Sequence, residues 1–294
     1  MVQSPFRLNN LVMNVEQQSN REIEDPRQGD IGVLRIRQME LLEIPGVPGL
    51  SVSTINWPAD RITGDGYGII PKRNPGLFIF DVTDHGLSTA MDWSMVNTAL
   101  NIFSRMDYSP LEVMHHAEHH LQKISGENYV PVTALYGEIN LTKGTLEYVH
   151  AGHVKPLIYS HLAQKLVFDA DITENSNSGG NGRAMNTGTA DQPADNVPED
   201  LNYYGHKTAI APGDAIILYT DGVIEGRNRH GHSLGEDKFK NVVEVVISSA
   251  GSPLTAGNIT KGIETALKDF YEGAQLDDDC SVMAVVIAGP TNIL

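Results

Sequence analysis

Strand-like segments occur in runs along this sequence and do not alternate strictly with helices. Short apolar or alternating segments predict strands at 51–57, 76–82, 132–140, 145–151, 156–160, 165–169, 215–220 and 281–287. Apolar periodicity predicts a short helix from about residue 35 and further helices from about residue 87, over 110–124 and over 258–271. This order favours an α+β fold with mostly antiparallel sheets over a doubly wound parallel sheet.

Apolar spacing predicts which face of two helices is buried. Two of the joins between strands look like hairpin turns. On the helix that begins near residue 87 we expect a shared face of Leu87, Ala90, Met91, Ser94, Thr98 and Ile102. On the helix at 110–124 we expect Leu111, Met114, Ala117, Leu121 and Ile124 to be buried. The segments NLTKGT (140–145) and AGHVKP (151–156) predict the two turns.

The 294 residues, 40% of them hydrophobic, suffice for one large domain or two small ones. Residues 1–34 are polar and predict an arm or linker helix with little core. Residues 35–290 then form the main domain. Within it, 172–200 are rich in Gly, Asn, Ser, Thr and Asp and predict a flexible insertion that is too polar to pack.

The formal net charge of −16 argues against a nucleic acid or an anionic membrane as a partner, because both need clustered basic residues. We find no signal-peptide pattern at the start and no apolar run of the roughly 20 residues that a membrane span needs. The single cysteine, Cys280, excludes an internal disulfide and is expected to be a small core residue. We therefore expect a cytoplasmic protein. The excess acid serves either solubility or the gathering of cations.

Four acidic sites lie at the ends of strand-like segments, each beside a glycine or another acid. They are Asp65 in RITGDGYG, Asp81 in IFDVTDHG, Asp221 in LYTDGV and the run 277–279 in QLDDDCSV. Burying an unpaired carboxylate is costly, and few basic residues lie near these sites in the sequence. Hard cations such as Mg²⁺ or Mn²⁺, bound through oxygen, solve that problem. Taken singly, each Asp is also explained as a turn residue or a helix cap.

Five segments in order carry a family resemblance: PGLSVSTINWPADRITGDGYG, FIFDVTDHGLSTA, TALYGEINLTKGTLEYVHAGHVKPLIY, IAPGDAIILYTDGVIEGRN and LDDDCSVMAVVI. Over residues 35–289 the chain resembles the PPM-type metal-dependent serine/threonine protein phosphatases, in their bacterial SpoIIE and RsbU branch. The resemblance implies a layered α-β-β-α sandwich, with two packed, mainly antiparallel sheets flanked by helices. It also implies two Mn²⁺ or Mg²⁺ ions and attack on phosphoserine or phosphothreonine by a hydroxide that bridges them.

The resemblance also implies site residues. The acid of the family's GGD motif falls on Asp65, the first acid of its DVSGHG motif on Asp81, and the acid of its TDG motif on Asp221. The backbone carbonyl of Val82 is implied as a further ligand. The late DD[IV]T motif falls on DDCS, which makes Asp278 a ligand and Asp279 either an alternative ligand or a support for the ligands.

The chain departs from the family pattern at two places. After Asp65 the pattern's aromatic residue and its later acid are replaced by Gly66 and Gly68. Asp84 stands where the family usually has glycine. Four interpretations are open: a cap for the helix that begins near residue 87, a ligand of an extra ion, a more distant partner of the site, or a sign that the active site is damaged. His85 is a candidate general acid, although a metal-bound water also serves that role.

Other histidines predict structural roles. His153 in AGH is expected to hold its turn, and the histidines of HHAEHH (115–120) are expected to be solvated flanks of a helix and not metal ligands.

The predicted function is a metal-dependent phosphoprotein phosphatase. The resemblance implies a bacterial signalling regulator as substrate, a small anti-sigma-antagonist-type protein in a partner-switching pathway, and a possible homodimer. The alternative is a catalytically impaired, phosphatase-like binding module. A third interpretation, TGDGYG as a degraded nucleotide-cyclase loop, leaves the TDG and DDD sites without a place.

Overall fold

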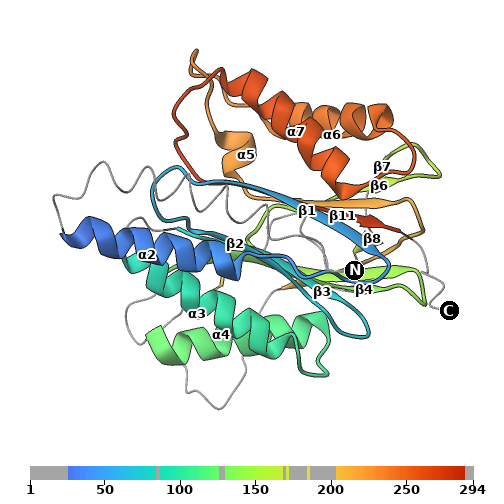
Figure 1. Ribbon diagram of the computed structural model, residues 1–294. Coiled ribbons are helices and arrows are strands. Elements are labelled where there is room, and N and C mark those ends of the chain that lie inside the picture. The colour runs from blue at the N-terminus through green and yellow to red at the C-terminus, as the bar shows by residue number, and fades with distance from the viewer. Residues whose placement is uncertain are drawn as a thin grey trace, which may run out of the picture.

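Two antiparallel sheets form the centre of the computed structural model, which describes residues 26–83, 87–125, 130–167, 170–171, 184–185 and 203–288 (Figure 1). One sheet has the order β1 (Leu50–Trp57), β11 (Cys280–Ile287), β10 (Ala215–Tyr219), β6 (Leu157–Ser160), β7 (Lys165–Val167). The other has the order β2 (Asp65–Ile70), β3 (Gly76–Val82), β4 (Val132–Asn140), β5 (Thr145–Ala151), β9 (Tyr204–Ala209), β8 (Ala170–Asp171). All neighbouring strands in the two sheets are antiparallel, as predicted.

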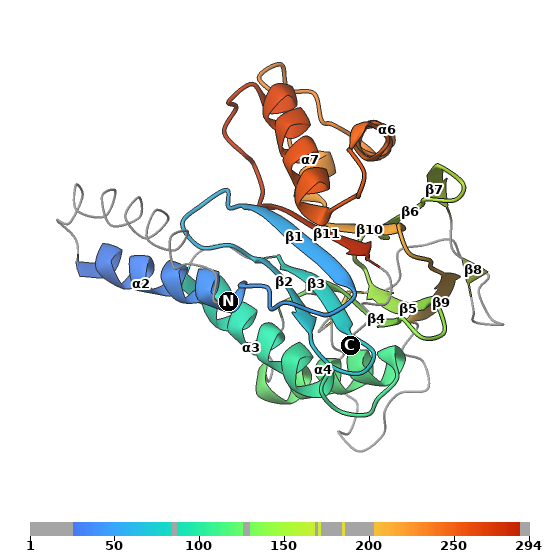
Figure 2. The same cartoon turned by 45° about the vertical axis from the view of Figure 1, so that its right-hand side comes forward.

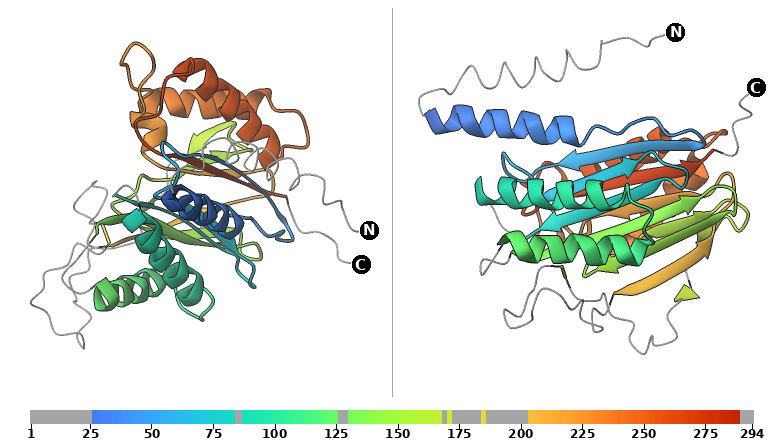
Figure 3. Two further views of the ribbon diagram at one scale, coloured as in Figure 1. Left: turned by 60° about the vertical axis from the view of Figure 1, so that its left-hand side comes forward. Right: turned by 90° about the horizontal axis from the view of Figure 1, so that it is seen from below.

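Helices cover the outer face of each sheet. Helices α6 (Glu236–Ser249) and α7 (Ala256–Tyr271) lie on the five-stranded sheet, and α3 (Leu87–Phe103) and α4 (Pro110–Ser125) lie on the six-stranded sheet (Figure 2). Helix α2 (Pro26–Leu41) runs beside α3, and the short α5 (Gly222–Glu225) follows β10 (Figure 3). The predicted layered α+β sandwich is confirmed. Within the described ranges, every helix is too short or too polar to cross a lipid bilayer.

The layers are built by the alternation of side chains along each strand. On β10, Ile217 and Tyr219 belong to the core that packs under α6 and α7, and Tyr219 lies 4.8 Å from the ring of Phe239 on α6. Ile216 and Leu218 belong to the core that includes the six-stranded sheet. Successive side chains of a strand point to opposite faces, so each sheet serves two buried surfaces at once.

The GDGYG segment forms a strand that the sequence analysis did not predict. Gly66 pairs with Phe80 and Gly68 with Phe78 across β2 and β3. A Cβ on Gly66 would lie 2.1 Å from the Phe80 ring, and one on Gly68 would lie 2.5 Å from the Phe78 ring. The rings thus fill the space above both glycines, and the two positions require residues without a side chain.

The predicted buried faces of two helices are wrong in part. On α3, Met91 is 69% exposed and Ile102 46% exposed, whereas Trp93 and Leu100 are fully buried. Trp93 determines the rotation of the helix, because its Nε1 donates a hydrogen bond to a backbone carbonyl of β2 (2.7 Å) and its ring packs on Phe80. On α4, Met114, Ala117 and Leu121 are buried as predicted, but Leu111 and Ile124 are exposed.

The turn predicted at 140–145 is confirmed, and the one at 151–156 is wrong. Strands β4 and β5 form a hairpin, whereas β5 and β6 belong to different sheets, so residues 152–156 carry the chain from one sheet to the other. Besides β2, the elements β8, β9, α5 and α6 were not predicted. Among the described side chains of β9, the buried one is His206, whose ring stacks on Tyr148 at 4.7 Å, and a buried histidine leaves no apolar pattern to recognise.

The ends of the predicted domain differ from the expected ones where the structure describes them. Helix α2 begins at Pro26, inside the predicted arm, and residues 1–25 lie outside the described part of the chain. Of the predicted insertion at 172–200, residues 184–185 are described. Met185 is fully buried, and its backbone pairs with Val132 through hydrogen bonds of 2.8 and 3.2 Å. That part of the segment packs, contrary to the expectation.

Candidate active site

Strands β2 and β3 bring the first two predicted acids together. Asp65 opens β2, Asp81 lies next to the end of β3, and the two are direct partners across the antiparallel pair. Asp65 is 1% exposed. The Asp65 N–H donates a hydrogen bond to the Thr63 hydroxyl oxygen (3.0 Å), which fixes the start of the strand. The sequence places both acids at the ends of apolar strands. The register of β2 against β3 then makes the two acids neighbours.

The other acids come from the second sheet. Asp221 directly follows Thr220 at the end of β10, and Asp278 and Asp279 directly precede β11, which pairs with β10. The Thr220 hydroxyl accepts a hydrogen bond from the Ser281 N–H (3.0 Å) and donates one to Asp65 Oδ2 (2.9 Å). This hydroxyl therefore joins the two sheets at the acids.

Asp279 anchors the segment that connects the two sheets. Its Oδ1 accepts from the Ala59 N–H (2.6 Å), and its Oδ2 accepts from the Gly64 N–H (2.7 Å) and the Thr63 hydroxyl (3.0 Å). Three donors on one carboxylate occupy most of its acceptor sites. The Asp278 carboxylate accepts a hydrogen bond from the adjacent Asp279 N–H (2.8 Å).

The Val82 carbonyl oxygen lies close to the same acids. A Cβ on Gly64 would lie 2.6 Å from this oxygen and 3.3 Å from Asp81 Oδ1. Both oxygens therefore approach the backbone of Gly64, where any side chain would collide with them. The glycine that precedes Asp65 keeps the space around the Asp81 carboxylate open.

Burial and mutual repulsion disfavour the charged forms of these acids. The pKa of Asp65 is raised well above its usual value by burial, and then by the charges of Asp81 and Asp279. Burial, followed by the charges of Asp221, Asp278 and Asp279, raises the pKa of Asp81 to about 7. Burial and then the charge of Glu225 also raise the pKa of Asp221. Negative charge thus accumulates here at an energetic cost.

Divalent cations fit this set of oxygen ligands. None of the ion pairs between described residues involves Asp65, Asp81 or Asp221. Carboxylate and carbonyl oxygens are the ligands that Mg²⁺ and Mn²⁺ take. In the described part of the chain, no three His, Cys, Asp or Glu side chains are grouped tightly enough to hold an ion by themselves. Backbone oxygens, waters and small side-chain movements are then needed to complete a metal site.

Two predicted site residues, Asp84 and His85, lie outside the described residues. The roles assigned to them stay predictions.

Several residues that support the site were missed by the sequence analysis. Gln38 on α2 is buried, and its amide exchanges two hydrogen bonds with the backbone of Thr63, at 3.0 and 3.4 Å. Thr220 and Trp93 bind the side chain and the carbonyl of Asp65. Thr63 and Thr220 stand one or two positions before a predicted acid, which is the one signal that pointed to them. Gln38 lies on a helix outside the motifs, and Trp93 follows one motif by three residues without matching any part of it, so nothing in the motifs indicates either residue.

His153 has the structural role that was expected, but it joins sheets and not the arms of a hairpin. It is 2% exposed, and its Nε2 lies 3.1 Å from the Tyr219 carbonyl on β10. A carbonyl oxygen accepts and never donates, so Nε2 carries the proton and Nδ1 accepts from the Thr133 hydroxyl on β4 (2.8 Å). Burial lowers the pKa of His153 to about 3.

The histidines of HHAEHH are less solvated than predicted. His116 is half-buried and stacks on Tyr108 with ring centres 4.4 Å apart, and the half-buried His115 lies 5.8 Å from the Tyr203 ring. Cys280 is a buried core residue, as expected, and burial raises the pKa of its thiol to about 12. A thiol of that kind is a poor nucleophile.

Comparison with known proteins supports the same class of enzyme. The family model described as Stage II sporulation protein E (SpoIIE) matches residues 71–172 and 184–287, more than half of the chain. Phosphoserine phosphatase RsbU of Bacillus subtilis (strain 168) is 25% identical over 276 residues, which cover 92% of this chain and 73% of RsbU.

Solved structures share the fold. The SiaA-PP2C domain of Pseudomonas aeruginosa has a TM-score of 0.64 at 15% identity and covers 95% of this chain and 98% of that domain. RsbX in complex with magnesium has a TM-score of 0.52 at 11% identity, over 81% of this chain and 95% of RsbX. The fold is that of the PP2C-type phosphatases. The chain belongs to the SpoIIE family, and it is a serine/threonine phosphatase.

Proposed function

We propose that the chain hydrolyses phosphoserine or phosphothreonine on a protein with the help of two divalent cations, Mn²⁺ or Mg²⁺. The observation that carries the proposal is the meeting of strand-end carboxylates from both sheets around Asp81. Burial of Asp81, and then the charges of its neighbours, raise its pKa to about 7. The family membership supports the same chemistry, and RsbX was solved with magnesium.

Asp65, Asp81, Asp221 and Asp278 are the proposed carboxylate ligands, with the Val82 carbonyl as a backbone ligand. Their placement on two sheets allows them to surround cations from opposite sides. We assign Asp279 a positioning role, because three donors from residues 59–64 already occupy its carboxylate.

Bound cations of this kind lower the pKa of water and polarise a phosphoryl group. The residues of the chain supply the frame. Thr220 orients the Asp65 carboxylate, Asp279 fixes the backbone of Gly64, and Gly64 leaves the Asp81 carboxylate accessible. Because these contacts are made within the protein, the carboxylates are preorganised and need little rearrangement when cations bind.

The substrate that we propose is a small phosphorylated signalling regulator, of the anti-sigma-antagonist type, in a partner-switching pathway. The likeness to phosphoserine phosphatase RsbU supports this class of partner. We also propose that two copies of the chain can form a homodimer.

The alternative, an impaired binding module, rests on Asp84, which lies outside the described residues, and on the missing aromatic residue and acid after Asp65. The structure gives those two glycines another explanation. The rings of Phe80 and Phe78 fill the space above Gly66 and Gly68, so the change is compensated in the core and leaves the carboxylates in place. The geometry therefore favours an active enzyme.

The test is the release of phosphate from a phosphoserine peptide by the purified protein, with Mn²⁺, with Mg²⁺ and with EDTA. We expect metal-dependent turnover that Asp221→Asn reduces by more than about 100-fold, since even residues that only support metal ligands contribute about 10–100-fold. Asp237→Asn, at an exposed position on α6, is the matched control and is expected to keep the wild-type rate. Turnover that persists in EDTA, or in Asp221→Asn, would contradict the proposal.

A further inference from the structure

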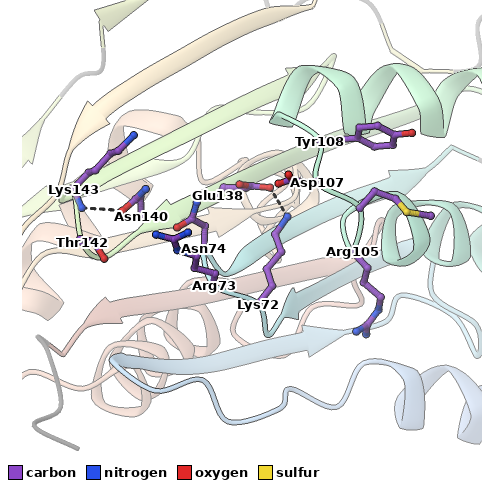
Figure 4. Close-up of a pocket in the computed structure, with 11 residues that line it drawn as sticks. Lys72, Arg73, Asn74, Arg105, Asp107, Tyr108, Glu138, Asn140, Thr142 and Lys143 are labelled. Atoms are coloured by element: carbon purple, nitrogen blue, oxygen red, sulfur yellow. Dashed lines mark hydrogen bonds and ion pairs between the residues drawn. The ribbon is translucent and has the colours of Figure 1, made fainter.

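A basic cavity lies at the opposite end of the six-stranded sheet from the acids. Its volume is about 440 Å³, and it forms where three connections meet: the β2–β3 turn, the segment between α3 and α4, and the β4–β5 turn (Figure 4). Strand β2 separates it from Asp65 by about 17 Å, from five residue steps of about 3.4 Å each. A ligand in this cavity does not occupy the proposed catalytic site.

The lining is positive on a chain whose overall charge is strongly negative. Four basic side chains, Lys72, Arg73, Arg105 and Lys143, stand against two acidic ones, Asp107 and Glu138. Among the described residues, Arg73, Arg105 and Lys143 form no ion pair, and all three are exposed. The cavity therefore offers cations whose charge the protein itself does not neutralise.

One lysine is held in place in the wall. Lys72 is mostly buried, and its Nζ donates to the Ser104 carbonyl (2.7 Å) and to Glu138 Oε1 (2.5 Å). The Tyr136 hydroxyl donates to the same Glu138 oxygen (3.0 Å). An ammonium has three N–H donors, so one remains for a ligand. Asn140 Oδ1 accepts from the Lys143 N–H (2.8 Å), which leaves the Asn140 NH₂ group as a further donor.

We propose that this cavity binds a small phosphate-bearing anion with at least two negative charges, such as a nucleoside diphosphate or pyrophosphate. Guanidinium and ammonium groups together match several phosphate oxygens. The volume lies within the roughly 300–1,000 Å³ of small-molecule sites.

The alternative occupant, an acidic peptide, fits the geometry less well. Peptides bind along extended grooves or add to a free strand edge. Glu138 and Asn140 belong to β4, and β3 and β5 pair with both edges of that strand. The remaining lining residues named here come from turns and connections, so the cavity offers no strand edge to a peptide.

The test is a calorimetric titration of the full chain with pyrophosphate, with ADP and with an acidic peptide, in EDTA and at low salt. EDTA removes metal-dependent turnover, so the result is independent of the proposed phosphatase activity. We expect the wild type to bind pyrophosphate, ADP or both, and the double variant Arg73→Gln/Lys143→Gln to bind at least about tenfold more weakly, as the loss of charged hydrogen bonds predicts. Binding of ADP that is tighter than that of pyrophosphate would identify a nucleotide, and equal binding would identify the phosphate group alone.

The control pair Lys238→Gln/Lys261→Gln removes the same charge from exposed positions on α6 and α7 and is expected to bind like the wild type. The proposal is overturned if neither anion binds at millimolar concentration, or if both double variants lose affinity equally. It is also overturned if the acidic peptide binds more tightly than either anion and Arg73→Gln/Lys143→Gln abolishes that binding, which would assign the cavity to a protein partner.

Discussion

The β2–β3 hairpin carries acids at its open end and basic residues at its turn, and the protein handles the two kinds of charge differently. At the open end, Asp65 and Asp81 are direct partners, and neither forms an ion pair with a described residue. At the turn, Lys72 is paired with Glu138, while Arg73 is exposed to solvent. One end holds buried charge without compensation, and the other compensates the charge that it buries.

The difference shows which end depends on a bound partner to be stable. Buried carboxylates that repel each other reduce the stability of the folded chain unless a cation joins them. Exposed arginines and lysines cost almost nothing, because water solvates them. The acidic end is therefore strained without metal, whereas the basic end is stable whether or not an anion is bound. Substitutions at the two ends are expected to have opposite consequences.

The largest expected effect is at Asp81. Asp81→Asn is expected to reduce phosphatase activity by more than about 100-fold and, in the absence of metal, to raise the midpoint of thermal unfolding. The amide removes a charge that Asp65, Asp221, Asp278 and Asp279 repel. Activity assays and thermal unfolding in EDTA measure the two effects. A variant that is both inactive and less stable would break the comparison.

Metal ions are expected to act in the opposite direction to that substitution. Mn²⁺ that binds one site at 100 times its dissociation constant stabilises the folded chain by about 2.7 kcal/mol. We expect wild-type unfolding to shift to higher temperature with Mn²⁺ and EDTA to reverse the shift, while Asp81→Asn responds much less. Glu138→Gln, at the basic end, is the matched control and is expected to respond like the wild type. An equal response of all three proteins would place the metal elsewhere.

His153 adds a pH dependence close to the acidic end. Its folded pKa of about 3 lies below the ordinary value of 6.5, so the unfolded chain takes up a proton that the folded chain refuses. The stability from neutral His153 is complete above pH 6.5 and falls as the pH drops towards 3, by about 2 kcal/mol between pH 8 and pH 5.

Asp81 contributes with the opposite sign, because its folded pKa of about 7 lies above 3.8. We therefore compare Asp81→Asn with Asp81→Asn/His153→Gln by urea unfolding from pH 8 to pH 5. The single variant is expected to lose more stability on acidification than the double variant. Parallel curves would show that His153 does not titrate as described.

The smallest expected effect is at Glu138. Glu138→Gln leaves the mostly buried Lys72 ammonium without its carboxylate and is expected to cost about 1–2 kcal/mol, because partial exposure weakens the pair. Chemical unfolding measures the loss, and phosphatase activity is expected to be unchanged. Stabilisation by Glu138→Gln would mean that both ends carry unfavourable charge, and the contrast between them would disappear.

Short-range patterns predicted an α+β fold with antiparallel sheets and placed acids at the ends of apolar strands. The sandwich of two packed sheets and the roles of the individual acids were implied by the family resemblance. Contacts between distant segments were not predictable in this way. The rotation of α3 depends on Trp93 meeting β2, and β2 itself was hidden by glycines whose space is filled by the rings of β3. The crossing at 152–156 looked like a hairpin because its residues suit a turn equally well. The support from Gln38 requires a helix that is separated from Thr63 by 25 residues.

The bonds of Asp279 to residues 59–64 have a consequence for the time at which the protein becomes functional during synthesis. The carboxylate that fixes the start of β2 is made more than 200 residues after that segment, and β11, which follows it, lies between β1 and β10 in the five-stranded sheet. A nascent chain that has reached residue 270 lacks both β11 and the anchor. The arrangement of the acids is therefore expected to form only after β11 has been synthesised.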